Sequence, residues 1–300
     1  MSTIEALRTP DDRFANLPGY AFAPHYRDDL PRYEGLRVHY LDEGPRDAAV
    51  TFLCLHGQPA WSYLYRKMIP VFAAAGHRVI APDLLGFGRS DKPVDEAVYT
   101  FDFHRGMLRA FIAALDLRNI ALVCQDWGGI LGLTIPPEMP DRFTRLLVMN
   151  TTIPVGEPVS EGFDRWRTFN RGQPDLDVGG LFRRSQPDLS AEEAQAYAAP
   201  FPDARFKAGV RRFPELVMTD PGMDGIAEAK RALEFWRVEW SGTTFMAIGM
   251  IDPVLGPDVM ARLRTAIRGC PPPLQIADGG HFVQEKGTAI ARAALTAFGL

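Results

Sequence analysis

Short apolar runs alternate with amphipathic stretches along most of the chain. Residues 36–42 alternate apolar and polar positions, whereas 50–55 and 120–125 are continuous apolar runs, as in strands buried on both faces. Residues 102–115 carry apolar positions at helical spacing. This alternation of strand and helix predicts an α/β fold with a mostly parallel, doubly wound sheet.

The remaining apolar runs predict where the sheet continues and where it is interrupted. Further strands are predicted at 78–81, 146–150, 244–248 and 274–277, and helices at 60–75, 190–199, 257–268 and 284–298. Between 151 and 221 proline, charge and short helical segments replace the strands. We therefore expect a core domain, residues 1–150 and 222–300, interrupted by a helical cap, or lid, of residues 151–221.

Composition and charge narrow the class of ligand. The 300 residues are 46% hydrophobic and 23% charged, as in globular proteins, and the formal net charge is −4. No basic stripe suits nucleic acid or an acidic membrane, and no apolar run suits a secretory signal or a membrane span. Cys54, Cys124 and Cys270 lack metal-site spacing. We expect a cytoplasmic protein with a small ligand and no nucleic-acid or membrane partner.

The strongest chemical signal is a carboxylate at a strand-to-helix turn. Asp126 follows the buried run 120–125 and precedes Trp127-Gly128-Gly129, which is the position of a nucleophile elbow. The segment resembles the α/β-hydrolase superfamily, although Asp replaces the common serine and Cys124 replaces a small glycine. A carboxylate is already ionised at neutral pH, so it can attack a carbon that bears a good leaving group without help from a base.

Two further residues match the partners that such a nucleophile needs. Attack would leave an alkyl ester of Asp126, whose hydrolysis requires a water activated by a histidine, and the histidine requires an orienting acid. Asp252 and His281 each follow a predicted strand, and the chain order nucleophile, acid, histidine is the one this fold uses. Each residue alone is explained by a cap or a loop role. Together, Asp126, Asp252 and His281 favour a catalytic triad.

Several segments resemble one family, the haloalkane dehalogenases, along nearly the whole chain. These segments are His56 to Tyr63, Pro82 to Pro93, Gln125 to Gly129, Ala198 to Pro202 and Gly280 to Glu285. The resemblance is closest to the subgroup with a second halide-binding tryptophan in the cap. It implies that the indole N–H groups of Trp127 and Trp166 hold the halide, and that the backbone N–H groups of Gln58 and Trp127 form the oxyanion hole. A tryptophan only donates, so it does not repel an anion.

The expected activity is hydrolysis of a small haloalkane by water to a primary alcohol and a halide, with no metal and no cofactor. An epoxide hydrolase would use the same triad but needs paired cap tyrosines, and the cap contains only Tyr197. A haloacid-type enzyme would need cationic side chains such as Arg165, Arg167 and Arg171. A ligand sensor without activity would tolerate loss of the triad, which is complete here. Measuring halide release from chloro- and bromoalkanes, beside a panel of epoxides, would distinguish these alternatives.

Overall fold

The structure is built around an eight-stranded sheet, in a computed structural model that describes residues 4–300. In spatial order the strands are β10 (Leu274–Ile276), β9 (Thr243–Gly249), β8 (Phe143–Met149), β7 (Ile120–Cys124), β4 (Thr51–Leu55), β5 (Arg78–Pro82), β3 (Val38–Glu43) and β2 (His25–Arg27). Neighbours are parallel from β10 to β5, and β3 is antiparallel to both β5 and β2. The predicted α/β fold with a mostly parallel sheet is confirmed. A separate small sheet pairs β1 (Ala6–Leu7) with β6 (Lys92–Pro93).

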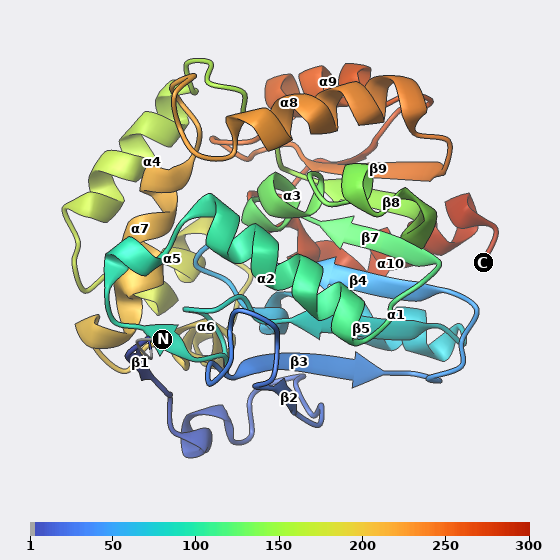
Figure 1. The fold of residues 1–300 in the computed structure, drawn as a ribbon. Helices are drawn as coiled ribbons and strands as arrows, with labels where there is room; N and C mark the ends of the chain where they lie inside the picture. Colours follow the sequence, from blue (N-terminus) through green and yellow to red (C-terminus); the bar gives the residue numbers. More distant parts are fainter. Residues whose placement is uncertain (1–3) are drawn as a thin grey trace.

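Helices cover both faces of the main sheet (Figure 1). On one face α1 (Ile69–Ala74) packs against α10 (Gly287–Phe298), and on the other α2 (Phe101–Ala114) packs against α3 (Trp127–Gly132). At the β9 end of the sheet, α9 (Pro257–Ala266) packs against β9. Every residue of β4 and β7 is buried, because both faces of these central strands are covered. This is why their sequences are continuous apolar runs.

A group of helices follows β8 and lies beyond the carboxyl ends of the parallel strands (Figure 1). They are α4 (Glu161–Arg171), α5 (Val178–Ser185), α6 (Ala191–Ala198) and α7 (Ala208–Leu216), and the chain then returns to the core through α8 (Ile226–Glu234). Here α5 packs against α6, and α4 packs against α7. Ser190 and Glu193 form a capping box that begins α6. Throughout residues 151–221, all of which are described, there is no strand.

Two predicted helices were wrong in their extent, because each is divided in two. The run 60–75 forms a short 3-10 helix, Ser62–Tyr65, and then α1, since Pro70 has no N–H and suits only the first turn of a new helix. The run 284–298 likewise begins as a 3-10 helix, Val283–Lys286, before α10. Other short 3-10 helices cover Asp11–Phe14, Glu96–Val98, Pro136–Glu138, Pro140–Arg142 and Ala204–Lys207, and a π-helix covers Phe235–Glu239. Over residues 4–300, no helix has the length and apolar character needed to cross a membrane.

Candidate active site

Asp126 occupies a strained turn between β7 and α3. Its backbone has φ 50° and ψ −126°, a conformation that residues with a Cβ rarely adopt. The two residues that follow β8 hold this turn in place. Asp126 N–H donates to the Asn150 carbonyl at 2.9 Å, and Thr151 Oγ1 donates to the Asp126 carbonyl at 2.7 Å. The turn also requires glycine at position 128, since a Cβ on Gly128 would lie 1.9 Å from the Leu55 carbonyl oxygen. The strain is therefore maintained by long-range contacts.

The carboxylate of Asp126 does not cap the helix that follows it. Among the described residues it makes no capping hydrogen bond to α3, and Oδ1 instead accepts the backbone N–H of Gln58 at 2.8 Å. A Cβ on Gly57 would lie 2.3 Å from that oxygen, so only glycine lets the loop approach so closely. The Gln58 side chain turns away and donates to the Val210 carbonyl at 2.8 Å. No comparable bond from the Trp127 backbone N–H to the carboxylate is present in the described structure.

His281 lies between the two carboxylates that the sequence had grouped with it. Its Nε2 is 3.5 Å from Asp126 Oδ2, and its Nδ1 is 2.9 Å from Asp252 Oδ2. Burial by itself would lower the pKa of His281, but Asp252 and Asp126 outweigh burial and raise this pKa to about 10. The imidazole is thus positively charged at neutral pH for as long as both carboxylates are ionised.

Asp252 is a buried acid with a donor that sequence reasoning missed. Asn150 Nδ2 donates to Asp252 Oδ2 at 2.9 Å, and the Val254 backbone N–H donates to Oδ1 at 2.8 Å. Burial favours the neutral acid, yet His281 and the backbone donors outweigh it, so the pKa of Asp252 is lowered. The signal for Asn150 was its place at the end of the predicted strand 146–150, at the same sheet edge as Asp126. Asp252 therefore remains an anion that can orient an imidazole.

The carboxylate of Asp126 and the imidazole of His281 face one largely apolar cavity of about 690 Å³. Asp126, His281, Trp127 and Trp166 all line it. Its apolar lining comes mainly from residues 151–221 and from nearby loops, including Ile153, Val155, Phe163, Leu181, Pro214, Val217, Leu255 and Phe282. Trp127 is held edge-on by Phe213, with 4.7 Å between ring centroids. The predominantly apolar lining suits a small apolar substrate that can reach the Asp126 carboxylate.

The five tryptophans divide into two groups by what their indole N–H groups do. Trp61, Trp236 and Trp240 donate to the Ala196 carbonyl, the Leu133 carbonyl and Thr244 Oγ1, at 3.2, 2.8 and 2.9 Å. Trp127 and Trp166 make no such bond to any residue in 4–300, and both line the cavity. Two neutral donors are consequently available in the cavity that Asp126 lines.

Residues weighed for other activities are engaged elsewhere. The hydroxyl of Tyr197 donates to Glu285 and does not line the cavity, so it is not placed to protonate an epoxide. Arg167 pairs with Asp164 and Arg171 with Glu215, and neither lines the cavity. Arg165 lines the cavity but pairs with Glu161 at 3.1 Å.

His56 shapes its loop, since its ring nitrogens bond to the Gly57 carbonyl and the Leu84 N–H. Within residues 4–300 no group of side chains is arranged to hold a metal ion.

Comparison with known proteins defines first the class and then the family. Residues 50–288 match the model of the alpha/beta hydrolase fold family, so the chain belongs to that family. It is 47% identical to a haloalkane dehalogenase of Psychrobacter cryohalolentis, over 96% of each chain, and 40% identical to one of Mycolicibacterium paratuberculosis, over 98% of each. Among solved structures, the tetrameric haloalkane dehalogenase of Paraglaciecola agarilytica superposes with a TM-score of 0.97 at 55% identity, covering 98% of this chain and 99% of that one.

Within the α/β hydrolases, the chain therefore belongs to the haloalkane dehalogenases. It is a hydrolase that acts on carbon–halide bonds, with a haloalkane and water as substrates and a halide as product. The family expected from the sequence is confirmed.

Proposed function

We propose that the chain hydrolyses small haloalkanes to primary alcohols through a covalent ester of Asp126. The observation that carries this mechanism is the Asp126 carboxylate itself, which lines an apolar cavity and lies within reach of His281. In the first step a carboxylate oxygen bonds to the substrate carbon as the carbon–halogen bond breaks, and the halide leaves with the bonding electrons. The indole N–H groups of Trp127 and Trp166 stabilise the charge that develops on the halide.

In the second step a water molecule attacks the carbonyl carbon of the Asp126 ester. Nε2 of His281 takes the proton from this water, and Asp252 stabilises the imidazolium that forms. The backbone N–H of Gln58, already 2.8 Å from Oδ1, stabilises the oxyanion, and the backbone N–H of Trp127 is the second donor. As this intermediate collapses, its bond to the alkoxy oxygen breaks and the His281 imidazolium gives its proton to that oxygen, which leaves as the alcohol. The carboxylic acid left at Asp126 then passes its proton to His281, which restores the carboxylate.

The cap is proposed as a second domain. We assign residues 151–221 to it and residues 1–150 and 222–300 to the core, because α4 to α7 lie together beyond the strand ends and supply much of the cavity lining. In this proposal the core supplies Asp126, Asp252 and His281, and the cap supplies Trp166 and most of the apolar walls. The subgroup with a halide-binding tryptophan in the cap is proposed on the same basis. A cytoplasmic location stays a prediction from the sequence.

A substrate panel tests this function against the alternatives. Halide release should be measured from short terminal chloro- and bromoalkanes, and diol formation from epoxides of matched length. We expect turnover of the haloalkanes alone, because the cavity offers donors for a halide and no cap tyrosine for an epoxide oxygen. Diol formation without halide release would favour an epoxide hydrolase. Binding of haloalkanes without turnover of any compound would favour a ligand sensor.

The two steps should respond differently to pH. Asp252 and Asp126 together raise the pKa of His281 to about 10, and esterification removes the charge of Asp126, so the pKa of His281 falls and the neutral imidazole becomes easier to form. Acidification returns the proton to Nε2 and leaves no base. Rapid-quench measurements between about pH 5 and 9 should show ester hydrolysis slowing as pH falls, while alkylation changes little. Equal loss of both rates would contradict this division of labour.

A further inference from the structure

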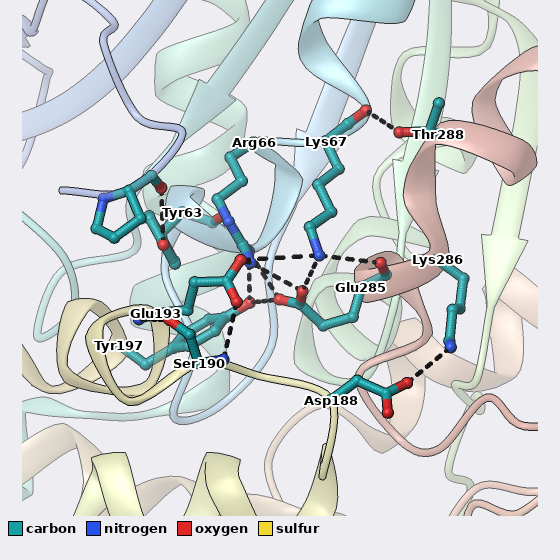
Figure 2. A network of polar contacts seen from close by, with 11 residues as sticks. Tyr63, Arg66, Lys67, Asp188, Ser190, Glu193, Tyr197, Glu285, Lys286 and Thr288 are labelled. Carbon is teal, nitrogen blue, oxygen red and sulfur yellow. Dashed lines mark hydrogen bonds and ion pairs between the residues drawn. The ribbon is translucent and has the colours of Figure 1, made fainter.

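Figure 2 shows a cluster of buried and partly buried charged side chains, none of which lines the cavity. Arg66 donates to both oxygens of Glu285 at 2.7 and 2.8 Å and to Glu193 at 2.8 Å. Lys67 adds a bond to Glu285 at 2.8 Å, and the Tyr197 hydroxyl donates to the same carboxylate. The side chains of Arg66 and Glu285 are only 2% and 5% exposed. Two cations and two carboxylates balance, as burial of charge requires. We call these five residues the anchor.

The anchor joins three segments that are far apart in the sequence. Arg66 and Lys67 follow the core 3-10 helix Ser62–Tyr65, while Glu193 and Tyr197 lie on α6 of the cap. Glu285 lies in residues 281–286, the histidine segment, four positions after His281. Burial would raise the pKa of Glu285, but Arg66 and Lys67 outweigh it and lower this pKa, so the carboxylate stays ionised. The anchor thus ties the cap and the histidine segment to one point of the core.

A stack of aromatic rings makes a second connection between the cap and the histidine segment. Phe282 stacks on Phe182 of α5 at 4.1 Å between centroids, and Phe182 stacks on Tyr197 of α6 at 3.6 Å. The ring of His281 lies edge-on to Phe282 at 4.9 Å. Lys286, at the end of the segment, bonds to Asp188 between α5 and α6 at 3.0 Å. Both cap helices therefore reach the residues beside the histidine.

The nucleophile is held by other contacts. Gln58 and the backbone around Asn150 fix Asp126, and neither belongs to the anchor or the stack. Side chains alone link the two segments: Gln125 Nε2 donates to the His281 carbonyl at 2.9 Å, and Gln284 Nε2 donates to Gln125 Oε1 at 3.4 Å. His281 Nε2 also lies 3.5 Å from Asp126 Oδ2, and none of these contacts holds the backbone of Asp126. A change in the anchor can therefore displace His281 while Asp126 keeps its position.

We propose that Tyr197 and Glu285 are positioning residues for the second half of the reaction. They hold the histidine segment so that Nε2 of His281 faces the ester of Asp126, and they make that alignment depend on the seating of α5 and α6. This inference rests on the proposed function, because it uses the assignment of His281 to ester hydrolysis. Loosening the anchor should slow hydrolysis of the ester and spare its formation.

The test variant is Tyr197→Phe, which keeps the stacked ring and removes the hydroxyl that donates to Glu285. Rapid-quench kinetics with 1,2-dibromoethane should show unchanged alkylation and roughly tenfold slower ester hydrolysis, since small displacements of a catalytic group are costly. Mass spectrometry should show more alkyl-enzyme at steady state than in the unmodified protein. The pH profile of ester hydrolysis should also shift, because the environment of His281 changes.

A matched control is Tyr33→Phe, which removes another buried hydroxyl, donating to the Phe103 carbonyl at 2.7 Å away from the histidine segment. This control should leave both steps unchanged. A uniform fall in both rates for Tyr197→Phe, or unchanged hydrolysis, would overturn the positioning role. If the His281→Gln protein forms no adduct, the proposed function fails and this inference with it. If the His281→Gln protein does form the adduct but the Tyr197→Phe protein hydrolyses its ester at the normal rate, the proposed function stands and only the positioning role is defeated.

Discussion

The His281→Gln protein is expected to release one equivalent of halide and then stop. Alkylation needs only the Asp126 carboxylate and the halide donors, whereas hydrolysis of the ester needs a base that glutamine cannot supply. After exposure to 1,2-dibromoethane, mass spectrometry should find one added bromoethyl group on the peptide that contains Asp126. Steady-state turnover should be abolished, which is the largest effect expected of any single substitution in the site other than loss of Asp126 itself.

Asp126→Ala is the control for this experiment, because it removes the proposed nucleophile and leaves the histidine in place. It should give neither adduct nor halide. Suppose instead that His281 activates a water that attacks the haloalkane directly. The His281→Gln protein would then show no burst of bromide and carry no adduct, and Asp126 would no longer be assigned as the nucleophile. The fold and family would be unaffected by that result.

Replacing Trp166 with phenylalanine should have the next largest effect on turnover. The substitution keeps an aromatic ring in the cavity wall and deletes the indole N–H, which has no partner within residues 4–300. Loss of one donor to a charge that develops in the transition state costs about 2.7–4 kcal/mol, or roughly a hundred- to a thousandfold in rate. Halide release in the alkylation step is the rate to measure, together with quenching of tryptophan fluorescence by added halide.

The control is Phe169→Leu, since Phe169 lies on the same helix, lines the same cavity and offers no donor. This variant changes the shape of the wall and should alter preference among substrates without the large loss of rate. Melting temperatures of both variants should be compared, because Trp166 is half-buried and its replacement should leave the core intact. Unchanged alkylation and unchanged halide quenching in Trp166→Phe would remove this tryptophan from the halide site.

The class of fold and the grouping of Asp126, Asp252 and His281 could be predicted from the sequence because their signals are local. Asp126 follows an apolar run and precedes two glycines, and this pattern within ten residues predicts a strand, a sharp turn and a helix. Asp252 and His281 follow short apolar runs in the same way. Parallel strands present their carboxyl ends at one edge, so residues after different strands are expected to meet there. The structure brings these three side chains together.

Helix boundaries were less readable, because they depend on contacts that periodicity does not report. The run 60–75 has apolar spacing throughout, yet Pro70 divides it, and the Ser62 backbone N–H donates to the buried Asp83 of another loop at 2.7 Å. The run 284–298 begins as a 3-10 turn where Glu285 enters the anchor. In both segments the first turn makes contacts with residues distant in sequence, which apolar spacing does not report.

The α/β class, the family resemblance and the grouping of Asp126, Asp252 and His281 at strand ends followed from the sequence, since each depends on short patterns of neighbouring positions. The tertiary structure was needed to show which of the five tryptophans have an indole N–H without a partner among residues 4–300, because that depends on acceptors such as the Leu133 carbonyl, which lies 103 residues from Trp236. It also decided that Asn150 supports Asp252, and that Arg66 and Tyr197 meet at Glu285. Hydrogen bonds and buried ion pairs act over about 3 Å in space with no fixed spacing in sequence, so their partners are set by the fold.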